Sequence, residues 1–257
     1  MTARRVLLWR HGRTAWNVQR KFQGQADPPL DDVGRAQARE AAAMLASVEP
    51  DAIYSSDLVR ATETAAALGA LTGLPVRLDR RLRERSLGQW EGLTRNEVAT
   101  LYPQEYAAWL AGREDCQTGS EPRSALAERA VAVLADLTGE VVVLVTHSAT
   151  TIAFTGRLLG LPQHSWRGVG PLANCHWSEF LRDDHGWRLR AHNVGPAGPV
   201  IPRPVADRLA DEQPPDAEAL DAGPPLDASP LQTGPPLGAG PSFDAGAESA
   251  APAASAS

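Results

Sequence analysis

The stretch Val6-Leu7-Leu8-Trp9-Arg10-His11-Gly12 carries the clearest architectural signal in the chain, because four apolar residues lead directly into a polar cluster. A short, continuous apolar run of this kind predicts a strand that is buried on both faces, as in a parallel sheet. Arg10 and His11 then stand where that strand ends. In open α/β sheets, ligands bind beyond the carboxyl ends of the strands. The stretch therefore predicts an α/β fold with a functional site at one edge of the sheet.

Strand-like and helix-like patterns alternate from this point as far as Gly160. Such alternation predicts a mostly parallel sheet with helices on both faces, which is a three-layer α/β/α domain. Spacing and flanking residues indicate further strands at 52–54, 76–78, 141–145 and 187–190, and helices at 36–48, 58–71, 125–137 and 149–159.

Composition divides the chain near residue 198. Residues 198–257 are dominated by Pro, Ala, Gly, Asp and Ser without hydrophobic periodicity, so we expect a disordered tail there and a single domain over residues 1–197. The tail holds nine acidic residues and two arginines, a net charge of −7, against −6 for the whole chain. Residues 1–197 are thus near +1. A near-neutral domain has no broad basic face, so nucleic acid is not an expected partner.

Cysteine usage and hydropathy indicate in which cellular compartment the protein is expected. Cys116 and Cys175 are far apart and form no C-x-x-C pair, so a reducing compartment is the simpler expectation. The apolar run at residues 6–9 is too short for a signal peptide, and no stretch approaches the length needed to span a membrane. We expect a cytoplasmic protein with no membrane partner, and the sequence allows a homodimer.

Functional side chains follow four of the predicted strands. Arg10 and His11 follow the first, Arg60 the second, Glu84 the third and His147 the fourth. Taken singly, each has a plain structural interpretation, such as a hydrogen-bonded histidine, a solvated arginine or a loop carboxylate. Because the carboxyl ends of parallel strands meet at one edge of the sheet, these side chains are expected to converge, which favours a functional site.

The combination suits phosphoryl transfer. A transferred phosphoryl group spreads its charge over three oxygens and needs fixed cationic donors, which arginine supplies in a planar, permanently charged form. Neutral imidazole is a nucleophile near neutral pH, and a carboxylic acid can protonate the leaving oxygen. Arginines and a second histidine supply the charge, so we expect neither a metal nor a cofactor.

At the level of motifs, the chain resembles the histidine phosphatase, or phosphoglycerate mutase-like, superfamily over roughly residues 4–195. An Arg-His-Gly tripeptide alone would be weak support, but five blocks stand in the right order at compatible spacings. They are Leu8–Thr14 with Asn17 and Gln23-Gly24, Pro29–Ala38, Ser55–Ala65, Leu82–Gly92 and Thr146-His147.

The resemblance implies a role for each matched residue. His11 would accept the phosphoryl group, and Glu84 would act as proton donor and then as base, with Glu91 as its main rival. We expect Arg83 and Arg85 to face solvent, because inward-pointing cations would oppose protonation of Glu84. The residues that would hold the phosphate oxygens or line the substrate entrance are Arg10, Arg60, His147, Thr14, Asn17, Gln23 and Gly24.

Three departures from the family pattern stand out. Arg13 replaces a usual Glu or Gln, and would either raise affinity for a second negative charge or face solvent. Ser148 and Ala149 replace the glycines that commonly follow the second histidine, although the Ser148 N–H could still reach phosphate. Residues 118–121, Thr-Gly-Ser-Glu, replace a more usual Gly-Gly-Glu.

The short segment Leu87–Gly92 is typical of phosphatases in the family, whereas phosphoglycerate mutases carry a longer one, so a hydrolase is favoured over a mutase. A narrower resemblance, carried by residues 71–79, 87–94, 113–115 and the Asn174…Trp177…Trp187-Arg188-Leu189 stretch, is to glucosyl-3-phosphoglycerate phosphatases. The expected function is hydrolysis of a small phosphomonoester, glucosyl-3-phosphoglycerate being one candidate. The alternatives are mutase-type phosphotransfer and a catalytically silent phosphate-binding or interaction module.

Overall fold

The computed structural model describes residues 3–113 and 118–196. The predicted tail at 198–257 and Cys116 lie outside the described residues.

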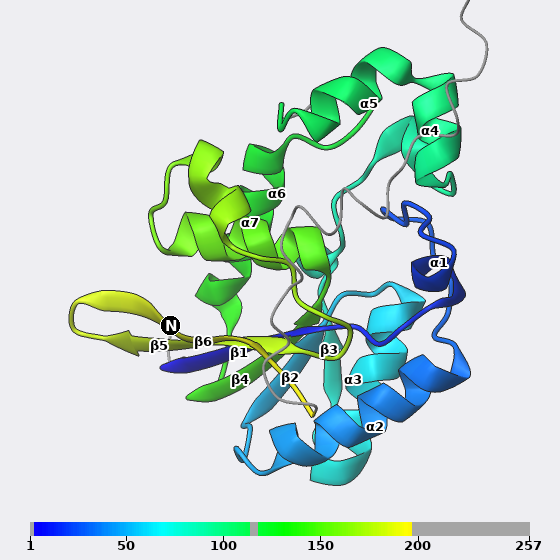
Figure 1. Cartoon of the computed structure of the whole chain (residues 1–257). Coiled ribbons are helices and arrows are strands. Elements are labelled where there is room, and N and C mark those ends of the chain that lie inside the picture. Colours follow the sequence, from blue (N-terminus) through cyan, green and yellow to red (C-terminus); the bar gives the residue numbers. More distant parts are fainter. Residues whose placement is uncertain (1–2, 114–117, 197–257) are drawn as a thin grey trace, which may run out of the picture. The chain divides into compact units, whose positions relative to one another are not determined.

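A six-stranded mixed sheet with the strand order β3-β2-β4-β1-β5-β6 organises the fold (Figure 1). β1 pairs in parallel with β4, β4 with β2, and β2 with β3, whereas β5 is antiparallel to both β1 and β6. The mostly parallel sheet predicted from the sequence is therefore confirmed. The strands are β1 (Arg5–Arg10), β2 (Ala52–Ser55), β3 (Val76–Leu78), β4 (Val141–Thr146), β5 (Trp177–Asp183) and β6 (Gly186–Val194).

Helices cover both faces of the sheet, as the alternating pattern predicts (Figure 1). α2 and α3 lie on one face and α6 and α7 on the other, while α4 and α5 lie beyond the α6–α7 layer. The α-helices are α1 (Ala15–Val18), α2 (Asp32–Ala46), α3 (Val59–Thr72), α4 (Arg95–Leu101), α5 (Pro103–Leu110), α6 (Arg123–Ala132) and α7 (Ser148–Leu158). The short 3-10 helices are η1 (Arg80–Leu82), η2 (Gly88–Trp90), η3 (Val133–Asp136) and η4 (Gln163–Gly168).

The apolar run of β1 is divided between two cores by the alternation of side chains along a strand. Leu7 and Trp9 pack with α2 and α3 on one face. Val6 and Leu8 pack with α6, η3 and Phe154 on the other. All four side chains are fully buried, which explains why the strand is apolar throughout and lies in the centre of the sheet.

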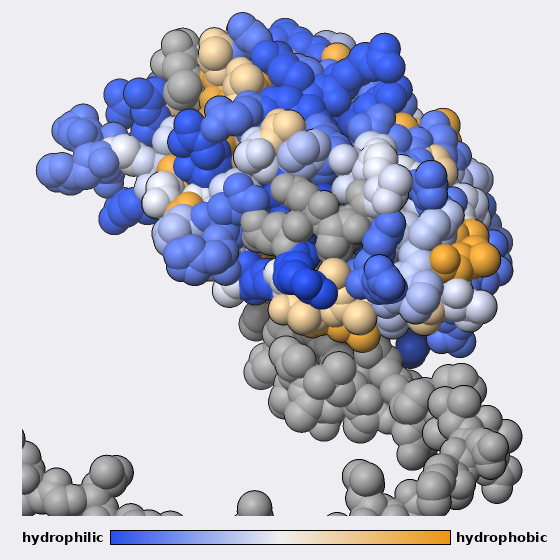
Figure 2. Space-filling model, turned by 90° about the horizontal axis from the view of Figure 1, so that it is seen from above, coloured by the Kyte–Doolittle hydropathy of each residue, from blue (hydrophilic) through white to orange (hydrophobic). Residues whose placement is uncertain are grey.

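The outer surface is mainly hydrophilic on the face drawn in Figure 2, with apolar residues in small, separate groups. Within the part of the chain that the structure describes, no helix combines the length and apolar character needed to cross a membrane.

Three parts of the fold differ from expectation. The sequence pattern does not predict β5, because Ser178 and Glu179 interrupt its apolar character; both are buried, the first paired with His192 and the second with Arg5 and Arg190. The helix predicted at 125–137 ends as α6 at Ala132 and continues as η3. The helices α4 and α5 are likewise absent from the prediction.

Candidate active site

The carboxyl ends of β1 and β4 bring the two predicted histidines together. The His11 N–H donates to the Thr146 carbonyl at 3.0 Å, which extends the pairing with β4 to the first residue beyond β1. The imidazole rings of His11 and His147 have centroids 5.1 Å apart and are tilted by 54°. Both side chains are buried, so the strand ends form the floor of a site that is shielded from bulk water.

Glycine is required after His11 because the backbone of another loop lies against it. A Cβ on Gly12 would come within 2.5 Å of the Gly34 carbonyl oxygen. The Gly12 N–H donates to the Thr64 hydroxyl at 3.0 Å, and that hydroxyl donates to the Arg60 carbonyl at 2.7 Å. Thr64 therefore connects the end of β1 to the first turn of α3, where Arg60 lies.

The hydrogen bond of His11 identifies its reactive nitrogen. Nδ1 lies 2.7 Å from the Gly12 carbonyl oxygen, which can only accept, so Nδ1 carries the proton and Nε2 keeps its lone pair. Burial lowers the pKa of His11 well below its ordinary value of 6.5, and the neighbouring charges of Arg60 and Arg10 lower it further. His11 is therefore a neutral imidazole at neutral pH, and its unprotonated Nε2 has the lone pair that a nucleophile needs.

We expect this protonation state to be visible by ¹⁵N NMR. Since the lowered pKa belongs to a base, His11 should remain uncharged as the pH falls through 6.5 and become protonated only at clearly lower pH. Its nitrogen shifts at pH 6.5 should be those of the Nδ1–H tautomer. A titration midpoint at or above 6.5, assigned with the His11→Ala variant, would contradict this assignment.

Arg60 is fixed and buried at the start of α3. Its two terminal nitrogens donate to the carbonyls of Ala26 and Gly24, both at 2.7 Å. Burial lowers the pKa of Arg60 to about 10, with Glu84 and Asp27 acting in the opposite direction, so the group remains cationic at neutral pH. Its buried Nε has no hydrogen-bond partner in the described part of the chain. The plain interpretation of Arg60 as a solvated surface charge is therefore wrong.

Arg10 has a similar arrangement at the end of β1. One terminal nitrogen donates to the Leu172 carbonyl, while its buried Nε lacks a hydrogen-bond partner among the residues described. Burial lowers the pKa of Arg10, and Glu84 opposes that effect.

His147 contributes a third donor at the same place. Its Nε2 lies 2.9 Å from the Ser56 hydroxyl, whereas its buried Nδ1 is unpartnered within residues 3–113 and 118–196. Burial, Arg60 and His11 hold the pKa of His147 well below its ordinary value. The Ser56 oxygen already accepts from the Leu58 N–H at 3.3 Å, so we assign the Ser56 hydroxyl hydrogen to Nε2 of His147, which leaves the ring hydrogen on Nδ1. Two arginine Nε–H groups and one imidazole N–H are then buried without an acceptor among the described residues, whereas buried donors are normally paired. An anion with several oxygens satisfies all three.

Thr14 and Asn17 form one unit at α1. The Thr14 hydroxyl accepts from the Asn17 N–H at 3.2 Å and lies 3.2 Å from Asn17 Oδ1, to which the Thr14 N–H also donates at 3.0 Å. Asn174 Nδ2 donates both to the His11 carbonyl, at 3.1 Å, and to Asn17 Oδ1, at 3.4 Å. The Thr14 hydroxyl thus caps α1 and positions Asn17, whose oxygen is occupied and whose amide nitrogen is its remaining donor.

The remaining predicted residues are Gln23, Gly24, Ser148 and Arg13. Gln23 is half-buried with its Oε1 unpartnered in the described chain, and Gly24 presents its carbonyl to Arg60. Gly24 has a φ of +49°, and a Cβ there would lie 2.2 Å from Glu91 Oε1. Ser148 is the first residue of α7. Arg13 is paired with Asp31 at 2.8 Å.

Glu84 is held at the N-terminal end of α7. Its Oε1 accepts from the N–H groups of Arg85 at 2.9 Å and Thr150 at 3.1 Å. The Thr150 hydroxyl lies 3.1 Å from the same oxygen and 2.9 Å from the Arg83 carbonyl oxygen. Oε2 of Glu84 accepts from the Ala149 N–H at 3.2 Å. This second oxygen has that single hydrogen-bond donor among the described residues.

Glu91 has a different environment. Its carboxylate accepts from the backbone N–H groups of Gln25, Ala26 and Leu87 at 2.9–3.1 Å and lies 3.3 Å from the Ser86 hydroxyl. These contacts join two loops, so Glu91 is a structural carboxylate. The geometry favours Glu84 over its rival as the acid.

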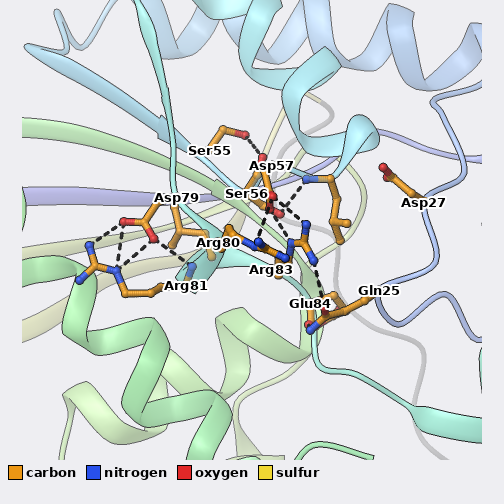
Figure 3. Close-up of polar contacts among 12 residues, drawn as sticks. Gln25, Asp27, Ser55, Ser56, Asp57, Asp79, Arg80, Arg81, Arg83 and Glu84 are labelled. Atoms are coloured by element: carbon orange, nitrogen blue, oxygen red, sulfur yellow. Dashed lines mark hydrogen bonds and ion pairs between the residues drawn. The ribbon is translucent and has the colours of Figure 1, made fainter.

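The expectation that Arg83 and Arg85 face solvent is wrong for Arg85, which is buried, whereas Arg83 is half-buried. Arg83 makes two hydrogen bonds with the Asp57 carboxylate, at 2.6 and 2.7 Å, and Figure 3 shows this pair close to Glu84. Arg85 is buried and donates to the Glu121 carbonyl at 2.6 Å. Both guanidinium groups are held by acceptors from distant parts of the chain, which the local sequence does not reveal.

Arg129 is a supporting residue that sequence reasoning missed. From α6 it donates to the carbonyls of Arg81, Arg83 and Glu84 at 2.7–3.0 Å, and it is paired with Glu121 at 2.6 and 2.8 Å. It therefore fixes the backbone on either side of the acid. The position of Arg129 in the pattern of α6 does not indicate this role. The local sequence around Thr64 and Asn174 likewise does not indicate their contacts with Gly12 and with His11.

The structure therefore brings the predicted phosphate ligands Arg10, Arg60 and His147, the predicted nucleophile and the predicted acid to one edge of the sheet. Within residues 3–113 and 118–196, no group of three or more His, Cys, Asp or Glu side chains is arranged as a metal site.

Comparison with known proteins agrees with this geometry. The family described as "Histidine phosphatase superfamily (branch 1)" matches residues 6–195. A glucosyl-3-phosphoglycerate phosphatase of Mycolicibacterium vanbaalenii is 40% identical over 191 residues, which are 70% of this chain and 85% of the relative. Phosphoglycerate mutase-like protein 4 of Arabidopsis thaliana is 40% identical over 194 residues, 72% of this chain and 83% of that protein.

A solved structure of a related phosphatase also has the same fold. A mycobacterial glucosyl-3-phosphoglycerate phosphatase in complex with VO3 superposes with a TM-score of 0.69 at 39% identity, over 74% of this chain and 99% of that one. The family match spans nearly all of the described residues and includes the five motif blocks. This chain belongs to branch 1 of the histidine phosphatase superfamily.

Proposed function

We propose that the protein hydrolyses a small phosphomonoester through a phosphohistidine on Nε2 of His11. One observation carries the proposal. A buried, neutral imidazole with a free Nε2 lies beside three buried N–H donors that have no acceptor among the described residues, on Arg10, Arg60 and His147. A phosphoryl group supplies the oxygens that these donors need and the phosphorus that Nε2 attacks.

In the first step, Nε2 of His11 forms a bond to phosphorus while the bond from phosphorus to the alcohol oxygen breaks. Glu84 delivers the proton on Oε2 to that oxygen, so the product leaves as a neutral alcohol. In the second step, a water oxygen attacks phosphorus, Glu84 takes a proton from that water, and the N–P bond breaks. His11 returns to its starting state and inorganic phosphate leaves.

The cationic groups stabilise the charge on the transferred group. Arg10 and Arg60 are held by the backbone carbonyls of Leu172, Ala26 and Gly24. Donors fixed in this way need no reorganisation as charge develops, which is the basis of electrostatic stabilisation in enzyme sites. The Asn17 amide and the Ser148 N–H lie nearby in the chain as further donors.

For the substrate, we propose glucosyl-3-phosphoglycerate. The support is the activity named for the Mycolicibacterium vanbaalenii relative at 40% identity and for the mycobacterial phosphatase whose structure superposes on this chain. Mutase-type phosphotransfer is the competing possibility, because a plant relative of similar identity is named a phosphoglycerate mutase-like protein. Release of inorganic phosphate from glucosyl-3-phosphoglycerate, without isomerisation of 3-phosphoglycerate, distinguishes the two.

A first assay tests the reaction class. The full chain should release phosphate from a generic aryl phosphate at the same rate with and without a chelator, because arginine and histidine side chains supply the charge that a metal otherwise brings. Loss of activity with chelator and its return with a divalent ion would show that a metal is required. A catalytically silent phosphate-binding module would release no phosphate under either condition.

We also propose that residues 1–197 are the catalytic domain and that residues 198–257 are dispensable for chemistry. A chain ending at residue 197 should keep its kcat and KM within about twofold and lose little melting temperature, since the composition of the tail provides no core. A large fall in either on truncation, measured beside the full chain, would show that the tail packs on the domain.

A further inference from the structure

An apolar pocket of about 140 Å³ lies next to the proposed acid. Its walls come from α5, α6, α7 and η4 and from the loops around Phe22 and Leu87. Most of the lining is aromatic or aliphatic. The lining residues are Phe22, Arg85, Leu87, Trp109, Arg123, Leu126, Ala149, Ile152, Ala153 and Trp166.

The polar atoms of the larger walls are occupied elsewhere. The Trp166 indole N–H donates to the Leu161 carbonyl at 2.9 Å, and Trp166 packs so closely on α7 that a Cβ on Gly156 would lie 2.3 Å from its ring. Phe22 and Trp109 contact each other edge to face, with ring centroids 5.6 Å apart. Arg85 directs its guanidinium to the Glu121 carbonyl and the Ser120 hydroxyl. The pocket therefore presents mainly hydrocarbon.

Two lining residues connect this pocket directly to the acid. The Arg85 N–H donates to Oε1 of Glu84 at 2.9 Å, and the Ala149 N–H donates to Oε2 at 3.2 Å. In an in-line transfer, the leaving oxygen lies opposite the attacking His11 and within hydrogen-bond reach of the acid. The carbon skeleton attached to that oxygen then lies beside Glu84, whose carboxylate accepts hydrogen bonds from two residues of the pocket wall.

We propose that this pocket binds the alcohol portion of phosphomonoesters whose alcohol is apolar and carries a ring, and that the protein hydrolyses such esters as a substrate class beyond glucosyl-3-phosphoglycerate. The proposal rests on the proposed phosphatase function and adds a preference that the phosphate site alone does not give. The size of the pocket sets the size of the group, because an apolar cavity of about 150 Å³ holds one benzene molecule. One six-membered ring on a short linker is the matching alcohol.

The test compares ethyl phosphate with 2-phenylethyl phosphate. The two alcohols are of similar acidity, so chemistry alone favours neither ester and a difference in kcat/KM reports contacts to the ring. Burial of a group the size of a phenyl ring should raise kcat/KM by about 10- to 100-fold. Equal values for the two esters in the unaltered protein would overturn the proposal without any variant being needed.

A variant that fills the pocket, compared with a matched control, shows whether the preference for 2-phenylethyl phosphate arises in the pocket. Ile152→Phe occupies the pocket from α7 and should reduce the ratio between the two esters to below about threefold, with ethyl phosphate turnover retained. Leu158→Phe makes the same kind of change at the other end of α7, outside the lining, and should preserve the ratio. A ratio that survives Ile152→Phe would overturn the proposal. No turnover of either ester, together with no phosphorylated His11, would instead refute the phosphatase function beneath it.

Discussion

His11→Ala should lower kcat for any phosphomonoester by at least about 10³-fold, because the variant lacks the atom that receives the phosphoryl group. Nδ1 of His11 donates its hydrogen to the Gly12 carbonyl, so Nε2 is the ring nitrogen available to attack phosphorus. Steady-state phosphate release with glucosyl-3-phosphoglycerate and with an aryl phosphate measures the loss. Near wild-type turnover by the variant would show that another group, or water directly, attacks phosphorus.

Two further measurements separate lost chemistry from lost structure. Arg10, Arg60 and His147 remain in the variant, so inorganic phosphate should still bind with an affinity within about tenfold of the original. His192→Ala serves as the matched histidine control. His192 lies on β6, where its ring contacts the Ser178 hydroxyl and the Gly170 carbonyl, and it takes no part in the proposed site. That variant should keep its activity. Equal losses in both variants would indicate a general effect on folding.

Glu84→Gln should slow hydrolysis of an alkyl phosphate by about 10²- to 10⁴-fold, the usual contribution of a positioned acid. An alkoxide is a poor leaving group unless it is protonated as its bond breaks, whereas an activated aryl oxide needs little protonation. The loss should therefore be smaller for an aryl phosphate, where the first step limits the rate. Phosphate binding should be nearly unchanged, because the donors on Arg10, Arg60 and His147 are retained.

Glu91→Gln is the matched carboxylate control. Glu91 joins the 25–26 loop to Leu87 through backbone N–H groups, so its loss should lower stability and affect both ester types alike. Rate losses that depend on the leaving group should appear only in the Glu84 variant. The opposite result, with Glu84→Gln innocuous and Glu91→Gln selectively impaired on alkyl esters, would move the acid to Glu91.

Strands whose apolar character extends over their whole length could be predicted from the sequence. β1 and β4 are buried on both faces, so Val6–Trp9 and Val141–Val145 are apolar without interruption. The convergence of His11 and His147 then follows from the parallel pairing of these strands. Sequence reasoning placed the two histidines correctly because their positions depend on local pattern and on one topological rule.

Long-range polar contacts could not be predicted. The Glu121 carbonyl draws Arg85 inward. Arg129 donates to the backbone carbonyl of Glu84, which is 45 residues away in the sequence. Glu179 is buried in β5 because Arg5 and Arg190 neutralise it, which disguises the strand as a polar segment. In each case the environment is set by a partner distant in sequence, and a charged residue alone does not indicate whether such a partner exists.

Direct detection of phosphate on His11 tests the central claim most directly. Enzyme mixed with a labelled phosphomonoester and quenched within one turnover should carry phosphate that is stable to base and released by acid, mapping to the peptide that contains His11 in fragmentation mass spectra. The same protocol should leave the His11→Ala variant unlabelled. Phosphate recovered on another residue, or rapid turnover with no acid-labile label on His11 at any quench time, would contradict the account.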